Sequence, residues 1–160
     1  MSEAAASGAA ASGAAASGAA GDPGARDLFS YVLRLGDLSL VLGQRLGEWV
    51  GHSPALEEDL GLANIALDLI GQARLLLTYA GEIEGRGRGE DEIAFLREHG
   101  EYLNAILAEQ PNGDFGQTIV RQLMIDLFQF ELFQRMTGST DPRLAAIAAR
   151  RSSADPVMRW

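Results

Sequence analysis

Apolar residues at intervals of three and four constrain this chain more than any other feature of its sequence. Between Asp27 and Val50, successive large apolar side chains are separated by steps of 4, 3, 3, 4, 4 and 3 residues. They are Leu28, Val32, Leu35, Leu38, Leu42, Leu46 and Trp49. This spacing places them on one face of an α-helix. No segment shows the alternation typical of a strand, so the sequence predicts an all-α protein.

Four more helices are expected after the first, separated by glycine and proline. Their approximate ranges are 53–80, 91–109, 115–137, and a short fifth helix that opens at 141–142. Ser53 is the expected N-cap of the second helix, and Asp114 with Gln117 resembles a capping box. Short connections join neighbouring helices antiparallel, which favours an up-and-down bundle. Because the fifth helix loses its periodicity within about three turns, part of the apolar face is expected to lack a cover.

The two ends of the chain differ in composition from the helical region. Residues 1–24 contain eleven Ala, five Gly and four Ser, arranged as a five-residue repeat without an apolar face. We therefore predict a disordered low-complexity tail over 1–25, a partial helical domain over 26–150, and a separate tail over 151–160. The first segment lacks the basic start and the leucine-rich stretch of a signal peptide.

Charge and the rarer residue types exclude several classes of function. The chain has a formal net charge of −9 and no Cys, and its imidazoles are limited to His52 and His99. Disulfides, Cys-ligated metals and thiol catalysis are therefore excluded. The acidity disfavours nucleic acid and anionic membrane surfaces. Without an uninterrupted apolar window of 18 residues, no membrane span is expected, and a cytoplasmic location is predicted.

Polar residues occupy helix positions where apolar ones are expected. Asp126 interrupts an apolar stripe of the fourth predicted helix, and Asp68 and Gln72 are one turn apart on the second. Inward acids from several helices can build a carboxylate-bridged di-iron site, but that site uses a Glu-x-x-His pattern, which this sequence lacks. Buried acids are otherwise stabilised by arginines. We therefore predict a structural polar network and no catalytic, cofactor-binding or metal-binding residues. Its members are Asp37, Arg45, Glu48, Asp68, Gln72, Arg74 and Asp126.

Three segments of the sequence resemble one known family. They are the runs over 35–54, 63–74 and 109–115. Together they are similar to the C subunits of phenylacetyl-CoA 1,2-epoxidases, over about residues 27–150. The resemblance implies a ferritin-like helical subunit of a multicomponent monooxygenase that epoxidises the ring of phenylacetyl-CoA in aerobic phenylacetate breakdown. It also implies partners: a homologous catalytic oxygenase component, the A subunit, which holds a di-iron centre, and further subunits that deliver electrons.

The same resemblance also indicates whether this chain has the ligands of a di-iron centre. The second helix of the catalytic A subunit has an Asp-Glu-x-Gly-His pattern, which falls here on 68–72. Leu69 and Gln72 therefore stand where the metal-binding Glu and His are expected, and Asp126 stands at the place of an acidic ligand. The resemblance thus implies a chain that binds no di-iron centre and lacks catalytic activity alone. Family members are longer, which implies that this chain is truncated at its C-terminus.

Two alternatives to the structural subunit remain open at this point. One is a divergent di-iron oxidase that uses carboxylates alone, which the iron content of the purified protein would identify. The other is a free-standing helical interaction module that binds a partner through its aromatic fourth helix. Co-purification with a ferritin-like oxygenase subunit would separate that module from the leading interpretation.

Overall fold

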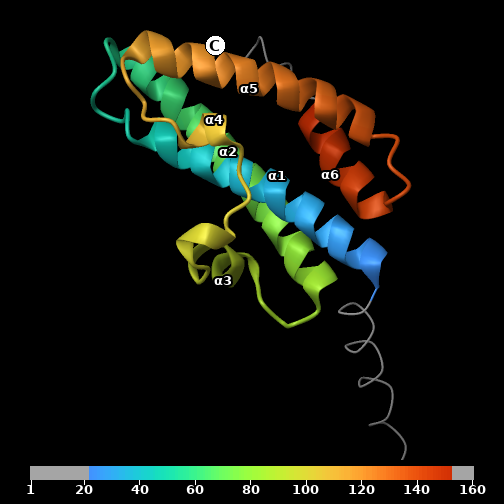
Figure 1. The fold of residues 1–160 in the computed structure, drawn as a ribbon. Helices are drawn as coiled ribbons and strands as arrows, with labels where there is room; N and C mark the ends of the chain where they lie inside the picture. The colour runs from blue at the N-terminus through green and yellow to red at the C-terminus, as the bar shows by residue number, and fades with distance from the viewer. Residues whose placement is uncertain (1–21, 153–160) are drawn as a thin grey trace, which may run out of the picture.

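The computed structural model describes residues 22–152 and shows six α-helices and one 3-10 turn in that range (Figure 1). The first two helices form a long hairpin: α1 spans Pro23–Gly47 and α2 spans Leu56–Glu84. α1 begins where the Asp22 carboxylate accepts a hydrogen bond from the Gly24 N–H at 3.1 Å. Gly85, with φ of 68°, ends α2 in the left-handed conformation that favours glycine.

Small residues let α1 and α2 approach closely along the hairpin. A Cβ atom at Gly36 would lie 2.7 Å from Cδ2 of Leu77, and one at Gly43 would lie 3.2 Å from the carbonyl oxygen of Ala66. The two glycines are seven residues apart, which is two helical turns, so they lie on one face of α1. Their contacts run in opposite directions along the two helices, and the pair is therefore antiparallel.

The second pair of helices is α5, over Phe115–Met136, and α6, over Pro142–Ser152. The Asp114 carboxylate accepts a hydrogen bond from the Gln117 N–H at 2.8 Å, which confirms the predicted cap. Asp141 does the same for the Leu144 N–H at 2.7 Å and also accepts a 2.5 Å bond from the Tyr79 hydroxyl. Asp141 thereby fixes the start of α6 against α2.

The connection between the two pairs differs from the prediction. Instead of one helix over 91–109, it contains α3 (Glu90–Phe95), a 3-10 turn (His99–Glu101) and α4 (Ile106–Glu109). The single-helix prediction was wrong because the buried carboxylate of Asp37 binds both the Arg97 side chain and the Leu103 N–H. Between α3 and α4 the backbone is not α-helical, and this allows the Leu103 N–H to donate to the Asp37 carboxylate.

Other helix boundaries in the structure differ from the predicted ones by a few residues. α2 begins at Leu56, after Ala55, which makes no side-chain cap, so the predicted Ser53 cap was wrong. α2 also continues four residues past the predicted end, to Glu84. At the chain ends, α1 begins at Pro23 and α6 extends to Ser152. The rest of the two predicted tails, 1–21 and 153–160, lies outside the described residues.

Buried apolar side chains form two adjacent clusters along the bundle. One contains Val32, Leu76, Leu77, Ile93 and Phe133, together with residues of α6. The other occupies the opposite end and is defined by Leu38, Leu42, Leu46, Leu62, Ile65, Ala66, Leu69, Ala108 and Ile125. α5 runs antiparallel to α1, because Trp49 donates to Thr118 at one end and Tyr31 donates to Met136 at the other. The fold is an all-α, ferritin-like antiparallel bundle.

Within residues 22–152, α2 is the one helix long and apolar enough to span a membrane by length and composition. Its most apolar window has a mean hydropathy of 1.4, and 44% of that window is buried inside the protein. A core helix of a soluble protein passes the same test. α2 packs closely on α1 along the hairpin, as core helices do.

Candidate functional site

Over residues 118–129, the inward face of α5 is mostly polar and its outward face is apolar. Five polar side chains of this helix are buried: Thr118, Arg121, Gln122, Asp126 and Gln129. Five large apolar ones are instead 43–60% exposed: Val120, Leu123, Met124, Leu127 and Phe128. This arrangement reverses the usual amphipathic pattern of a helix that covers a core. The polar layer lies where side chains of facing helices build cofactor sites in bundles of this kind.

Asp126 lies at the centre of this polar layer and is 3% exposed. Its Oδ1 atom accepts a hydrogen bond from the Gln122 amide at 3.0 Å. The guanidinium of Arg151, from the last turn of α6, lies 4.0 Å from the same oxygen. The carboxylate is therefore held by an amide on its own helix and by a cation from the neighbouring helix.

α2 contributes an amide and an apolar side chain to the bundle interior. The Gln72 amide donates a 2.8 Å hydrogen bond to the Ser39 hydroxyl, which in turn donates to the Leu35 carbonyl oxygen. The Oε1 atom of Gln72 is buried and has no hydrogen-bond partner among residues 22–152. Leu69, one turn earlier, is fully buried in the apolar cluster that also contains Ile125.

A second polar centre is the ion pair between Asp37 and Arg97. Both side chains are almost fully buried, and the two guanidinium Nη atoms donate to the two carboxylate oxygens. The Leu103 N–H adds a third hydrogen bond at 2.8 Å. Arg97 also lies over the ring of Tyr102, 4.3 Å from its centroid. The pair fastens the α3–α4 connection to α1.

Sequence reasoning missed Arg97. It lies in a polar stretch with several charged neighbours, and nothing in its local spacing distinguishes it. The sequence feature that could have revealed this ion pair is the position of its other member, Asp37. Asp37 stands in the middle of the apolar run 32–42, and a carboxylate there needs a cation from another segment.

The structure does not bring the seven predicted network residues together. Arg45 and Glu48 pair at 3.1 Å near the end of α1, where both are partly exposed. Arg74 is exposed and pairs with Glu90 of α3 at 2.9 Å. Asp68 is exposed on α2. Asp37, Gln72 and Asp126 are buried, each with the separate partners described above.

Arg121 holds the turn that precedes α5. Its guanidinium donates to the Gln110 carbonyl oxygen at 2.8 Å and to the Asn112 side-chain oxygen at 2.5 Å. Asn112 in turn donates to Glu48 at 2.8 Å. Burial lowers the pKa of Arg121, and the nearby charge of Arg45 lowers it further. The turn is thus tied to both α1 and α5.

The donor set of the polar layer does not fit a di-iron centre. Within residues 22–152, no group of three or more His, Asp or Glu side chains could hold a metal ion. One carboxylate, Asp126, is surrounded by amides and a guanidinium, whereas a bundle di-iron site draws on four carboxylates and two imidazoles. His52 and His99 are exposed, outside the bundle interior. This chemistry suits hydrogen bonding and gives iron too few anionic ligands.

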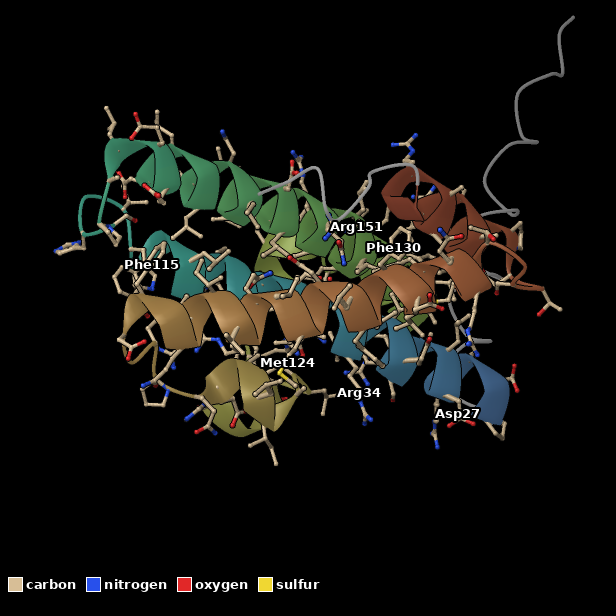
Figure 2. All side chains as sticks on the ribbon, turned by 90° about the horizontal axis from the view of Figure 1, so that it is seen from above. Asp27, Arg34, Phe115, Met124, Phe130 and Arg151 are labelled. Carbon is tan, nitrogen blue, oxygen red and sulfur yellow. The ribbon has the colours of Figure 1, made fainter. Side chains whose placement is uncertain are left out.

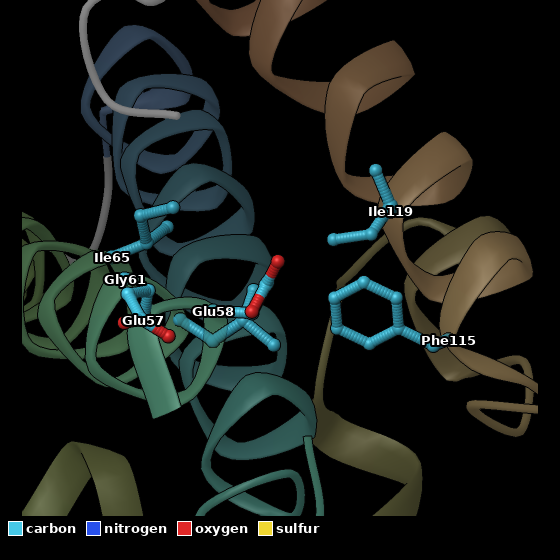
Figure 3. A pocket seen from close by; sticks show the side chains of 7 residues that line it. Glu57, Glu58, Gly61, Ile65, Phe115 and Ile119 are labelled. Carbon is cyan, nitrogen blue, oxygen red and sulfur yellow. The ribbon is translucent and has the colours of Figure 1, made fainter. Parts of the chain in front are cut away.

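Two of the cavities lined by α2 lie between it and different helices, the first between α2 and α5 and the second between α2 and α6. The first, of about 390 Å³, is lined by Glu57, Glu58, Gly61, Leu62 and Ile65 of α2 and by Phe115 and Ile119 of α5 (Figure 3). The second, of about 470 Å³, is lined by Leu67, Asp68, Gly71, Gln72 and Leu75 together with Ile147, Arg150 and Arg151 of α6. Both cavities open to solvent.

Comparison with known proteins places the chain beside one family and one curated relative of that family. A family model described as phenylacetic acid catabolic protein matches residues 12–153. The C subunit of 1,2-phenylacetyl-CoA epoxidase from Escherichia coli (strain K12) is 57% identical over 123 residues, which is 77% of this chain and 49% of that relative. The chain therefore spans about half the length of the curated relative.

Proposed function

The chain belongs to the phenylacetic acid catabolic protein family, and from that premise we propose that it is a non-catalytic helical subunit of a phenylacetyl-CoA 1,2-epoxidase complex. In this role it acts in the cytoplasm in aerobic phenylacetate breakdown. It pairs with a catalytic subunit that holds the di-iron centre, and other subunits of the complex supply electrons. Its contribution is a rigid helical surface rather than a reacting group.

The observation that carries the proposal is the chemistry of the bundle centre. Leu69 is fully buried among apolar side chains, and Gln72 binds Ser39. Neither side chain is an anionic or imidazole ligand of the kind that iron requires. Asp126 is the one acid of the inward face of α5, and its Oδ1 atom is already bound by Gln122. A bundle with this interior supports a partner and does not activate oxygen itself.

Co-expression with the catalytic subunit of a phenylacetyl-CoA epoxidase tests the proposal. We expect the two chains to co-purify, with all stoichiometric iron in the partner and no oxygen consumption by this chain alone. An Asp126→Asn variant should leave the iron content of the complex unchanged, since Asp126 is not a ligand. Stoichiometric iron in the isolated chain, lost in Asp126→Asn, would overturn the proposal in favour of a carboxylate oxidase.

A further inference from the structure

The segment between α2 and α3 alternates glycine with arginine, and the proposed function makes no use of it. Residues 85–89, which we call the α2–α3 loop, read Gly-Arg-Gly-Arg-Gly and join the two helices at the edge of the bundle (Figure 1). Gly85 and Gly87 have positive φ angles of 68° and 74°, in the left-handed region that favours glycine. Within residues 22–152, no backbone–backbone hydrogen bond involves residues 86–88. Few contacts therefore hold the backbone of this loop.

Arg86 differs from the other described arginines in both its backbone and its exposure. The sequence contains thirteen Arg and no Lys, and within residues 22–152 the Arg outside helices are Arg86, Arg88 and Arg97. The exposed fraction of the side chain is 3% for Arg97, 33% for Arg88 and 71% for Arg86. The others lie on helices, as Figure 2 shows for Arg34 of α1 and Arg151 in the last turn of α6.

Arg88 is fixed against α2, whereas Arg86 extends into solvent. The Arg88 guanidinium donates to both carboxylate oxygens of Glu84, at 2.7 and 2.5 Å. Arg86 comes within only 3.8 Å of the same carboxylate. The backbone oxygen of Arg88 also lies so close to Gly81 that an added Cβ there would be 2.3 Å from it. Of the two loop arginines, Arg86 is thus the one that another molecule can reach.

An exposed arginine on an irregular backbone is what an arginine-directed serine endoprotease requires. Such enzymes hold the arginine in a pocket that contains a carboxylate. They bind the flanking residues in extended form, which a helix adopts only by unfolding. Exposed loop tips with small residues are the preferred sites of cleavage in native proteins. Arg86 meets these conditions, and Gly87 after it has no side chain to obstruct binding.

We propose that the peptide bond between Arg86 and Gly87 is a processing site for an arginine-directed serine endoprotease, and that the cut protein stays assembled as two fragments. The reaction consumes one water molecule. The water oxygen bonds to the carbonyl carbon of Arg86, which becomes a carboxylate, and both water protons end on the Gly87 nitrogen, which leaves as an ammonium group. The proposal concerns the α2–α3 loop and does not depend on the role of the chain in an epoxidase complex.

Contacts outside the loop should hold the two fragments together. One fragment contains α1 and α2, and the other contains α3 to α6. The buried ion pair of Asp37 and Arg97 joins them, and the Tyr79 hydroxyl of the first donates to Asp141 of the second at 2.5 Å. Ile93 of α3 is fully buried in an apolar cluster with side chains of α1 and α2. Because none of these side chains belongs to the loop, cutting the loop leaves all of these contacts in place.

Limited digestion of the full, folded chain with trypsin tests the proposal. Among the sites in residues 27–149, we expect the first cut after Arg86, identified by the new N-terminus at Gly87. Arg74 is the matched control site, because its side chain is 74% exposed but belongs to α2. Cleavage after Arg74 should be at least tenfold slower. In denaturant the two sites should be cut at similar rates, since both backbones are then irregular.

Two substitutions separate Arg86 from its neighbour in the loop. Arg86→Gln should lower the rate of cleavage in the loop at least tenfold, with an unchanged circular dichroism spectrum. Arg88→Gln removes the pair with Glu84 that ties down the residues before the cut, so cleavage after Arg86 should become at least threefold faster. Arg74→Gln should leave cleavage of the loop unchanged. Size exclusion of the cut parent chain should give one species at the elution volume of the intact chain, which separates into fragments in denaturant.

Four results would contradict the proposal. The first is a loop that resists trypsin while the helices are cut. The second is cleavage after Arg74 as fast as after Arg86. The third is cleavage of the loop in Arg86→Gln at the rate of the parent chain. The fourth is separation of the fragments without denaturant, which would show that they do not stay assembled. None of these results involves iron or a catalytic partner, so failure here is distinguishable from failure of the proposed function.

Discussion

At the scale of single residues, the Asp37–Arg97 pair is where one substitution should matter most. Asp37→Asn leaves the Arg97 guanidinium buried, 3% exposed, without an opposing charge. Removing one partner of a buried pair costs about 3–5 kcal/mol. We expect the free energy of unfolding in denaturant, followed by circular dichroism, to fall by that amount. The α3–α4 connection should also lose its hydrogen-exchange protection, because Leu103 is held by the same carboxylate.

The Arg74–Glu90 pair is the matched control for this prediction. Its 2.9 Å geometry is as good, but the Arg74 side chain is 74% exposed. Exposed pairs contribute little because water solvates and salt screens both charges. Arg74→Gln should therefore leave the unfolding midpoint almost unchanged. Equal destabilisation by the two substitutions would show that burial of the Asp37 carboxylate is not the cause.

Gln129 offers the opposite case, a residue whose removal should stabilise the chain. It is 1% exposed, and within the part of the chain that the structure describes its amide nitrogen and oxygen are both buried without a hydrogen-bond partner. Each unsatisfied buried polar group costs roughly 1–3 kcal/mol. Gln129→Leu should raise the free energy of unfolding by about 1 kcal/mol or more. If Gln129→Leu instead lowers the free energy of unfolding, the Gln129 amide makes a stabilising hydrogen bond. In that case Gln129→Glu should destabilise the chain at least as much as Gln129→Leu.

At the scale of helices, two glycines of α2 should respond to alanine in opposite directions. Gly71 lies in open space, so Gly71→Ala should stabilise the isolated chain by up to about 1 kcal/mol through helix propensity. At Gly81, an added Cβ would lie 2.3 Å from the backbone oxygen of Arg88. Gly81→Ala should therefore destabilise the chain by about 1–3 kcal/mol, as overpacking does. Thermal unfolding of the two variants side by side is the measurement.

At the end of α2, the stabilisation that the Glu84–Arg88 ion pair provides should depend on pH. Arg88 donates hydrogen bonds of 2.7 and 2.5 Å to the Glu84 carboxylate, and this holds the pKa of Glu84 below its ordinary value of 4.5. A lowered carboxyl pKa contributes stability that is present above about pH 4.5 and is lost as the pH falls through the folded-state value. Glu84→Gln should be less stable than the parent chain at pH 7, and the difference should narrow below pH 4.5. A constant difference would exclude titration of Glu84 as the cause.

Helix spacing predicted α1, α2, α5 and the start of α6 within a few residues, because local periodicity and caps decide these elements. The same reasoning failed over 91–109, where the deciding contact is with Asp37, about 60 residues earlier. It also marked Asp126 as an anomaly but did not identify Arg97 and Arg151 as the arginines beside the buried acids Asp37 and Asp126. Pairing depends on tertiary distance, and Arg45, Arg74, Arg97 and Arg121 look alike in sequence.

At the scale of the whole molecule, the fold leaves apolar surface on two sides. One is the first cavity, between the start of α2 and the start of α5. The other is the outward stripe of α5, defined by Val120, Leu123, Met124, Leu127 and Phe128. The stripe lies on the side of α5 opposite its buried face, where polar side chains alternate with Ile125, Phe133 and Met136. Contiguous exposed apolar surface of this kind marks an interaction site or promotes aggregation.

The outward stripe should therefore govern self-association of the isolated chain. The net charge of −9 opposes association at long range, so any oligomer must gain its free energy from apolar contact. Leu127→Lys places a charge at the centre of the stripe, at a residue already 49% exposed, so the fold should tolerate it. We expect the concentration-dependent mass seen by light scattering after size exclusion to fall toward that of the monomer. Gln134→Lys adds the same charge at an exposed position of α5 outside the stripe and should change it little. If the two variants behave alike, the change in net charge, and not the apolar stripe, controls association.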